Sequence, residues 1–282
     1  MNYSQLKNIF QDWFDVVIDF IAFTPADIEK DFQLYKSKTK QFIFISSTTV
    51  YKRDFAHYIY SEESDVGNPF SNYAQNKLAC ENLLFSYFYY YNFPITIIRP
   101  SDTYDNRTVP IAVHGNHGIW QVLKRMQNLQ PVIIHGDGNS RWTVTHSIDF
   151  AKLFLPIIGC DTSIGQIIQV TSDEHYSWNE IYHEIARALG CELKPYYISS
   201  QTLAKYGEKF HFKDTLLGDA ANNSIFNNKK LKQFNKQYQP QIDLKTGIKT
   251  SVANIMLSSK LQVNDEEFDK WCEDIIKHFD SF

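Results

Sequence analysis

The sequence predicts an α/β fold, in which a parallel sheet with covering helices is followed by a smaller, more mixed C-terminal region. Two observations support this prediction. Over residues 15–99, short runs of apolar, β-branched and aromatic residues alternate with longer helical segments, in the order strand, helix, strand, helix, strand. Beyond residue 105 the pattern changes to short strands, turns and helices. Alternating strands and helices are typical of parallel sheets, because each connecting helix packs on the sheet.

The elements of the first half follow from local signals. Thr24 and Pro25 provide a cap and a first position for a helix that runs to about Lys38. Residues 4–12 resemble the end of an earlier helix. The other expected elements are a strand over 15–23, a strand over 41–47, a polar loop over 52–70, a helix over 71–91 and a strand over 94–99.

The second half is expected to contain shorter elements. Ser177-Trp178-Asn179-Glu180 has the pattern of a capping box and starts a helix that ends at Gly190. The strand over 166–170 is expected to join the main sheet. The remaining expected elements are helices over 119–129, 147–158, 244–259 and 265–279, and strands over 131–135, 141–145 and 194–198.

Composition and charge argue against several classes of protein. The 282 residues, 43% of them hydrophobic, suffice for one large domain or two small ones. A net charge of −4 provides no broad basic surface, so a nucleic-acid partner is not expected. The longest apolar run, 14–23, is too short to span a membrane. Without a signal peptide, the four widely spaced cysteines predict reduced thiols in a cytoplasmic protein: Cys80, Cys160, Cys191 and Cys272.

The candidate catalytic residues lie where the strand over 41–47 ends and the helix over 71–91 begins. Tyr73 and Lys77 are four residues apart, so they share one helical face. An ammonium group near a phenol stabilises the phenolate and lowers the pKa of the tyrosine from its usual value of about 10. Ser47, at the strand end, can hydrogen-bond the same substrate oxygen. Together the three side chains predict a device for proton transfer at a carbinol or carbonyl.

The order of these motifs is more specific than the tyrosine–lysine pair alone. One strand ends in Ser46-Ser47-Thr48-Thr49-Val50-Tyr51, the helix opens with Ser71-Asn72-Tyr73-Ala74-Gln75-Asn76-Lys77, and a later strand ends in Ile98-Arg99-Pro100. This set resembles the extended short-chain dehydrogenase/reductase family, which includes NAD-dependent epimerases and dehydratases of sugar nucleotides. The resemblance extends from about residue 12 to about residue 260 and is strongest over 41–104.

The resemblance implies specific roles. Ser47 is implied as the substrate-binding hydroxyl, Tyr73 as the acid/base, and Lys77 as its electrostatic partner, which also contacts the nicotinamide ribose. The implied cofactor is NAD or NADP, and its implied contacts are Phe20, Ala22, Lys77, Pro100 and Ser101. The implied substrate-binding residues are Thr48, Thr49, Tyr104, His114 and Arg141.

The resemblance also implies a division of the chain. Residues 1–104 with 147–175 are expected to form a truncated Rossmann-like core, and residues 105–146 with 176–282 a substrate-binding region. Family members commonly dimerise through helices that correspond to 25–38 and 71–91, so a homodimer is expected.

One family feature is missing from the sequence. The family holds the cofactor pyrophosphate with a Gly-rich turn that opens a helix. Here the first glycine is Gly67, and Gly136-Asp137-Gly138 does not open a helix. Judged against the family, the chain begins just before the fourth strand of the usual sheet, so the strand over 15–23 is expected at an exposed edge. A natural truncation, a mis-assigned start and a split protein are all consistent with this pattern.

Two further departures bear on the reaction. Many sugar-nucleotide enzymes of the family clamp the substrate diphosphate with an arginine, at a place that Trp142 occupies here, with Arg141 one residue early. The family's 4,6-dehydratases carry Asp-Glu after the catalytic hydroxyl, where this chain has Thr48-Thr49. A dehydratase is therefore disfavoured, and an epimerase, reductase or dehydrogenase is expected.

Three hypotheses follow. The first is an NAD(P)-dependent enzyme that acts on a hydroxyl or carbonyl of a sugar-like or nucleotide-linked substrate. The second is a non-catalytic protein on the same scaffold that binds RNA or another partner, and the third is an inactive fragment. A metal site is not expected, because His114 and His117 have no third ligand at suitable spacing. The segment 209–213 is expected to be a partly buried loop anchor, with a lid as the alternative.

Overall fold

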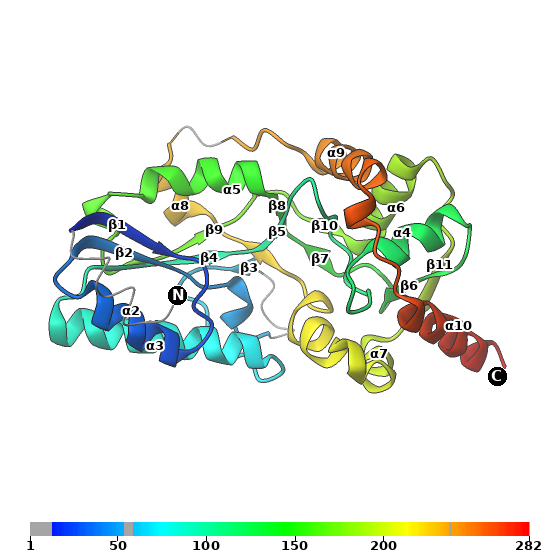
Figure 1. The fold of residues 1–282 in the computed structure, drawn as a ribbon, viewed down its shortest axis with the longest axis horizontal. Helices are drawn as coiled ribbons and strands as arrows, with labels where there is room; N and C mark the ends of the chain where they lie inside the picture. The colour runs from blue at the N-terminus through cyan, green and yellow to red at the C-terminus, as the bar shows by residue number, and fades with distance from the viewer. Residues whose placement is uncertain (1–12, 54–58, 237–238, 282) are drawn as a thin grey trace.

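The computed structural model describes residues 13–53, 59–236 and 239–281, and its centre is a four-stranded parallel sheet (Figure 1). The strands are hydrogen-bonded in the order β1 (Phe14–Asp19), β2 (Thr39–Ile45), β4 (Ile95–Pro100) and β9 (Ile167–Val170). The inner strands β2 and β4 are almost fully buried, as expected of a sheet covered on both faces. The predicted α/β fold is confirmed, including the place of β9 in this sheet.

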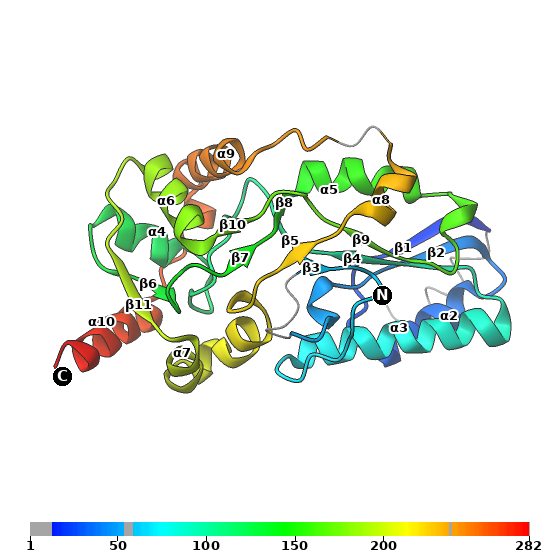
Figure 2. The same ribbon diagram turned by 180° about the vertical axis from the view of Figure 1, so that it is seen from behind.

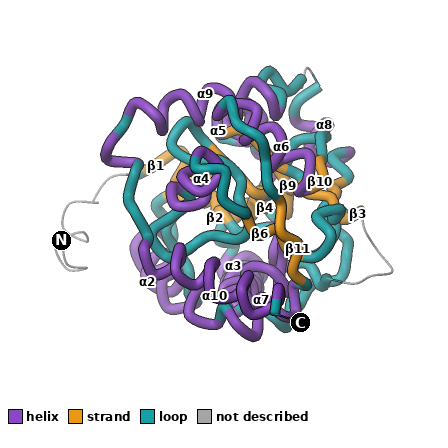
Figure 3. The backbone as a smooth tube through the Cα atoms, turned by 90° about the vertical axis from the view of Figure 1, so that its right-hand side faces the viewer, coloured by secondary structure: helices purple, strands orange, loops and turns teal. Residues whose placement is uncertain are grey.

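Helices cover both faces of the sheet, so this part of the molecule has three layers (Figures 1 and 2). On one face, Leu84 packs with Phe44 in a buried cluster, and on the other Leu153 packs with Ile168. Seen along the long axis, helices lie around the strands (Figure 3). The covering helices are α2 (Pro25–Tyr35) and α3 (Asn72–Tyr91) on the first face, and α5 (Ser147–Phe154) and α8 (Lys229–Phe234) on the second.

Local signals set the helix ends as predicted. The Thr24 N–H and hydroxyl, just before α2, both donate to the Asp27 carboxylate, at 3.1 and 2.8 Å. α6 (Trp178–Leu189) begins with a capping box at Ser177 and ends at Gly190, whose φ of 71° suits glycine.

The second region packs around the largest cluster of buried side chains, with pairs of short strands at its centre (Figure 1). β5 (Asp102–Tyr104) pairs with β8 (Val144–His146), and β7 (Arg141–Trp142) pairs with β10 (Tyr176–Ser177). The single strand predicted over 141–145 is therefore wrong, because β7 and β8 pair with different partners on either side of Thr143. The other elements are β3 (Ile59–Tyr60), β6 (Val132–His135), β11 (Pro195–Ile198), β12 (Ile225–Phe226), α4 (Trp120–Gln127), α7 (Ser200–Tyr206), a π-helical segment (Lys213–Ala220), α9 (Leu244–Leu257) and α10 (Glu266–Asp280).

Some expectations are refined. The polar loop over 52–70 contains the short strand β3, which pairs with β12. Within the segment 209–213, Phe210 and Phe212 are buried against Trp271, so the anchor interpretation is confirmed over the lid. The helix end predicted over 4–12 lies outside the described residues.

Strand β1 forms one edge of the sheet within the described part of the chain, where it pairs with β2 alone. Trp13, Phe20 and Ile21 beside it are 57%, 54% and 82% exposed. The placement of β1 at an exposed edge therefore matches the expectation from the sequence. The homodimer through α2 and α3 stays a prediction. Across the ranges that the structure describes, no helix combines the length and hydropathy needed to cross a bilayer.

Candidate active site

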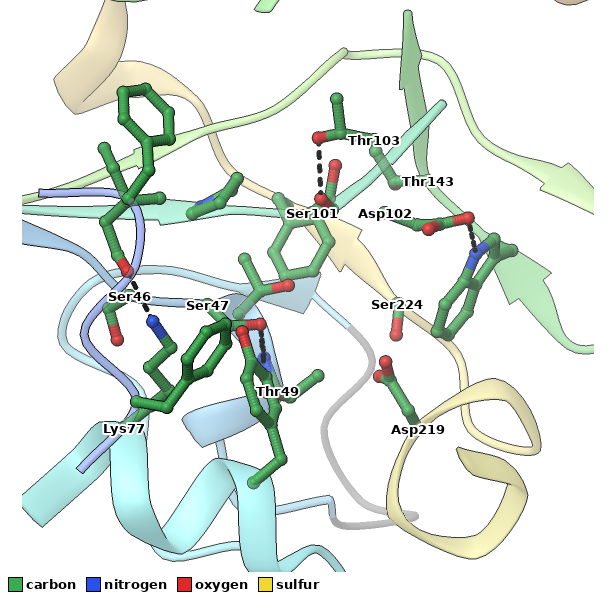
Figure 4. Close-up of a pocket in the computed structure, with 18 residues that line it drawn as sticks. Ser46, Ser47, Thr49, Lys77, Ser101, Asp102, Thr103, Thr143, Asp219 and Ser224 are labelled. Atoms are coloured by element: carbon green, nitrogen blue, oxygen red, sulfur yellow. Dashed lines mark hydrogen bonds between the residues drawn. The ribbon is translucent and has the colours of Figure 1, made fainter. Parts of the chain in front are cut away.

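The carboxyl ends of β2 and β4 open into a cavity of about 330 Å³ (Figure 4). Ligands of open parallel sheets bind at this edge, because the loops that follow the strands leave a crevice there. The lining includes Ser47, Tyr73 and Lys77, so the structure brings the three predicted catalytic residues to one cavity.

Ser47 and Tyr73 lie together because a strand end and a helix start meet at this edge. Ser47 follows β2, and its Oγ accepts hydrogen bonds from Thr49 N at 3.1 Å and Thr49 Oγ1 at 2.9 Å. Ser71 caps the start of α3 by accepting from Ala74 N at 3.1 Å, which places Tyr73 in the first turn of that helix. The Tyr73 hydroxyl then forms a side-chain hydrogen bond with Ser47.

The buried side chain of Lys77 links the turn after β1 to the end of β2 by hydrogen bonds. It is 2% exposed, and its Nζ donates to Ala22 O and Ile45 O, both at 2.8 Å. The same Nζ lies 4.7 Å from the ring centroids of Phe23 and Phe44, within the range of cation–π attraction. An ammonium group has three donors, so one remains for a ligand in the cavity.

The expected depression of the Tyr73 pKa is wrong for this structure. Burial raises the pKa of Tyr73, the hydrogen bond with Ser47 partly opposes this, and the charge of Asp219 adds to the rise. Lys77 does not reverse the effect, because its Nζ is bound to carbonyl oxygens and lies 5.7 Å from the centroid of the Tyr73 ring. Burial lowers the pKa of Lys77 itself.

The predicted cofactor contacts lie at the same cavity. Phe20, Pro100 and Ser101 line it, and buried Ala22 contributes its carbonyl to Lys77. The remaining Lys77 donor and these neighbours fit the nicotinamide and its ribose, which present hydroxyl acceptors and a flat ring. These residues concern the nicotinamide end of the cofactor.

A second cavity of about 400 Å³ adjoins the first. The two cavities share part of their lining, and we refer to them together as the cleft. Of the predicted substrate contacts, Thr48 and Thr49 line the first cavity and His114 lines the second. The shared residues are Thr49, Tyr73, Asp102, Trp142 and Asp219.

The structure does not bring the other two predicted substrate contacts to this cleft. Tyr104 is 3% exposed and packs beside His146, with ring centroids 5.1 Å apart. Arg141 Nη1 pairs with Glu180 at 2.8 Å, and its Nε contacts His175 Nδ1 at 3.3 Å. Arg141 lines neither cavity, since Trp142, its neighbour in the extended strand, takes the inward position.

Sequence reasoning missed several polar residues of the cleft, among them Asp102, Asp219 and Ser224. Asp102 follows the recognised Arg99-Pro100-Ser101 segment, so its place after β4 was a usable signal. Asp219 lies in the π-helical segment and pairs with the buried Arg53, a contact across 166 residues that no local pattern indicates.

A buried ion pair supports the strand that carries Ser47. Arg99 Nη2 and Nε donate to the two carboxylate oxygens of Glu81 at 2.6 and 3.0 Å, and both residues are at most 2% exposed. The Ser46 hydroxyl donates to the same carboxylate at 2.5 Å. The pair therefore joins β4, α3 and the end of β2 directly behind the cavity.

A carboxyl pair lies beside the turn that supplies a carbonyl to Lys77. Asp19 Oδ1 accepts from Ile21 N and Ala22 N at 2.7 and 3.0 Å, whereas its buried Oδ2 has no donor among the described residues. Burial, a hydrogen bond with Asp19 and the Asp19 charge raise the pKa of Asp31 to about 8. A proton on Asp31 thus supplies the donor that Asp19 lacks.

This pair predicts a pH-dependent stability. Because the folded state keeps the Asp31 proton and the unfolded state loses it near pH 4, stability falls as the pH rises from about 4 to about 8. Asp31→Asn keeps a donor at all pH values, so its melting temperature should fall less than that of the wild type between pH 5 and pH 8.5. Thermal melts followed by circular dichroism test this. Asp15→Asn, at a side chain that is 82% exposed, is the matched control, and equal slopes for Asp31→Asn and wild type would contradict the prediction.

Across the ranges that the structure describes, no group of three or more His, Cys, Asp or Glu side chains is placed to hold a metal ion. The Nδ1 atom of His114 lies 2.8 Å from the backbone oxygen of Gly115.

The fold and the cleft define an α/β protein with a parallel sheet and a Ser–Tyr–Lys site at the carboxyl edge of that sheet. Residues 32–171 match the family model described as NAD dependent epimerase/dehydratase family. The chain belongs to this family.

Two curated relatives agree with this assignment. The chain is 28% identical to mouse dTDP-D-glucose 4,6-dehydratase over an alignment of 161 residues that covers 51% of this chain and 43% of that protein. It is 26% identical to the Bacillus subtilis protein called uncharacterized UDP-glucose epimerase YtcB, over 75% of this chain and 59% of that protein. The chain thus spans less than half of the length of the mouse relative.

The fold resembles solved structures across most of the chain. UDP-glucuronic acid 4-epimerase from Bacillus cereus, in complex with NAD, superimposes with a TM-score of 0.69 and 22% identity, covering 92% of this chain and 79% of that one. RMD from Pseudomonas aeruginosa, complexed with NADPH, gives a TM-score of 0.68 and 17% identity, covering 90% and 85%. At these identities the likeness establishes the Rossmann-like fold.

Proposed function

We propose that this chain takes part in NAD(P)-dependent chemistry at a hydroxyl or carbonyl carbon of a sugar-like substrate. The observation that carries the proposal is the convergence of Ser47, Tyr73 and Lys77 on one cavity at the carboxyl edge of the sheet. The family assignment supports it, and so do the nicotinamide cofactors in the two solved structures described above.

The hydrogen bonds of Ser47 explain how the site would hold a substrate oxygen. Ser47 Oγ already accepts from Thr49 N and Thr49 Oγ1, so its own proton is directed away from Thr49. Without a ligand this proton is directed to the Tyr73 hydroxyl. A carbinol or carbonyl oxygen bound between the two hydroxyl groups would take it in place of Tyr73. Tyr73 then donates a proton to this oxygen in reduction and accepts one in oxidation.

The nicotinamide, when bound, supplies or accepts the hydride. Lys77 would bind the ribose next to the nicotinamide with its third N–H donor. Its other two donors stay bonded to Ala22 O and Ile45 O. Thr48 and Thr49 line the cavity where a dehydratase of the family carries carboxylates. We therefore expect epimerisation or simple oxidation and reduction rather than elimination of water.

Nucleotide binding is the first test. NAD⁺, NADH, NADP⁺ and NADPH are titrated into the purified chain by calorimetry, and nicotinamide absorbance is followed with candidate sugars. We expect at least one nucleotide to bind in the micromolar range, and Lys77→Met to weaken it at least tenfold through loss of the ribose contact. Lys30→Met, at a lysine that is 60% exposed, is the control. No binding at millimolar nucleotide would contradict the proposal.

A second candidate, a binding protein without catalysis, is favoured by one observation. The pKa of Tyr73 is raised, which leaves little phenolate near neutral pH. A binding protein would bind ligands in this cleft without any nicotinamide-dependent turnover. The titration and absorbance measurements above separate the two candidates.

A further inference from the structure

Three polar side chains, Asp102, Asp219 and Ser224, form a corner of the cleft on the side away from Lys77 (Figure 4). We refer to these three residues as the acidic corner. Asp102 lies in β5, Asp219 in the π-helical segment, and Ser224 just before β12. Three separate parts of the chain thus place oxygen atoms at one end of the cavity.

Ser224 is the unusual member of the corner. It is 2% exposed, it lines the cavity, and its Oγ has no hydrogen-bond partner among the described residues. Buried hydroxyl groups nearly always have a partner, because an unpaired one costs desolvation energy. An unpaired hydroxyl group at a cavity wall indicates that a bound ligand supplies the missing hydrogen-bond partner.

The charges of the corner are only partly compensated. The Asp219 carboxylate pairs with Arg53, whereas the Asp102 carboxylate accepts from the neutral Trp142 Nε1 at 3.3 Å. Among the described residues that line either cavity, Lys77 is the sole Lys or Arg, and its Nζ is bound to two carbonyl oxygens.

The titration behaviour of the corner agrees with this imbalance. Asp102 keeps contact with solvent in the cavity, yet the surrounding walls desolvate its carboxylate and raise its pKa. Burial also raises the pKa of Asp219 to about 6, opposed by Arg53 and assisted by the charges of Asp102 and Asp214. A cation bound at the corner would relieve this repulsion.

We propose that the acidic corner binds an ammonium group on the substrate, so that the substrate of this site is an amino sugar or a related amino polyol. The proposal rests on the proposed function for the role of Tyr73. An ammonium group offers three N–H donors, and the corner offers three acceptor groups, which are two carboxylates and one hydroxyl. Trp142 lines the same cavity and adds an aromatic wall of the kind that suits cations and sugar rings.

The same geometry opposes a nucleoside diphosphate at this end of the cleft. A diphosphate would place negative charge beside Asp102 and Asp219, and like charges at short range repel. The one arginine predicted to contact the substrate, Arg141, is paired with Glu180 away from the cavity. A corner that binds a cation therefore accounts for the two carboxylates in the cavity lining and for the position of Arg141 outside it.

The experiment compares three probes on the full chain at pH 7 by calorimetry: D-glucosamine, D-glucose and UDP-glucose. Glucosamine and glucose differ at one carbon, where an ammonium group replaces a hydroxyl. We expect glucosamine to bind about tenfold or more tightly than glucose, in line with hydrogen bonds to charged groups. Asp102→Asn should remove most of the preference for glucosamine over glucose. Adding Ser224→Ala to that variant should reduce the remaining preference further.

A control variant and three contrary results define this test. Asp274→Asn, at an exposed residue of α10, should leave all three affinities unchanged. Equal binding of glucosamine and glucose, tighter binding of UDP-glucose, or an unchanged preference in Asp102→Asn would each overturn the proposal. Because these measurements need no turnover, they remain valid if the chain proves inactive. Conversely, turnover that depends on Tyr73 without any preference for glucosamine would defeat the ammonium site alone.

Discussion

Tyr73→Phe should lower nicotinamide-dependent turnover by about 10²–10⁴-fold, the usual contribution of a general acid or base. The change removes the hydroxyl that donates or accepts the proton while it keeps the ring that lines the cavity. Tyr73 is 38% exposed, so we expect little loss of stability. The loss should therefore lie in kcat, with KM for the substrate changed far less, because Ser47 still binds the substrate oxygen.

The pH dependence gives a second signature of the same residue. Since the pKa of Tyr73 is raised, the phenolate that accepts a proton is scarce at neutral pH. Oxidation of a carbinol by the wild type should still accelerate as the pH rises above 8, and this acceleration should vanish in Tyr73→Phe. Tyr90→Phe, on the same helix at a side chain that is 81% exposed, is the matched control. Full turnover in Tyr73→Phe would remove Tyr73 from the mechanism.

The fold and the centre of the site could be predicted because their signals are local. Apolar runs long enough for one strand each mark β1, β2, β4 and β9, and alternation with helices indicates that they are parallel. Tyr73 and Lys77 share a helical face by their spacing alone. Ser47 joins them because a strand end and a helix start meet at the same edge of a parallel sheet. None of these inferences needs a contact between distant parts of the chain.

The rest of the site depends on contacts that the sequence does not display. Arg141 could equally have faced the cleft, but the pairing of β7 with β10 sets its side chain beside Glu180. Tyr104 is buried because α9 packs on it, and a Cβ on Gly247 would lie 2.0 Å from its hydroxyl. Asp219 reaches the cavity from a π-helical segment that no periodicity indicates. Each placement depends on tertiary packing rather than on a local pattern.

The role of Lys77 shows how such packing changes a chemical expectation. Its distance from Tyr73 along the helix suggested an electrostatic effect on the phenol. The end of β2 and the turn after β1 instead offer two carbonyl oxygens at hydrogen-bond distance, and they take two of the three lysine donors. Lys77 thus stabilises the end of β2 and the turn after β1, and burial sets the direction of the Tyr73 pKa shift.

The largest expected effect on stability comes from Glu81, the partner of Arg99 behind the cavity. Glu81→Ala leaves the Arg99 guanidinium buried without a counter-charge and deprives the Ser46 hydroxyl of its acceptor. Removing one partner of a buried ion pair costs about 3–5 kcal/mol, a large share of the roughly 5–15 kcal/mol that stabilises a typical domain. Urea unfolding should show a lower midpoint with an unchanged m-value.

The matched double variant Glu81→Leu with Arg99→Leu separates charge from packing. It removes both charges and fills much of the space, so we expect it to recover most of the stability that Glu81→Ala loses. If the double variant is instead as unstable as Glu81→Ala, packing rather than the unpaired charge explains the loss. Ser47 adjoins Ser46, so the recovered variant should also regain nucleotide binding. Stability without binding would mean that the Ser46–Glu81 hydrogen bond itself positions the Ser47 end of β2.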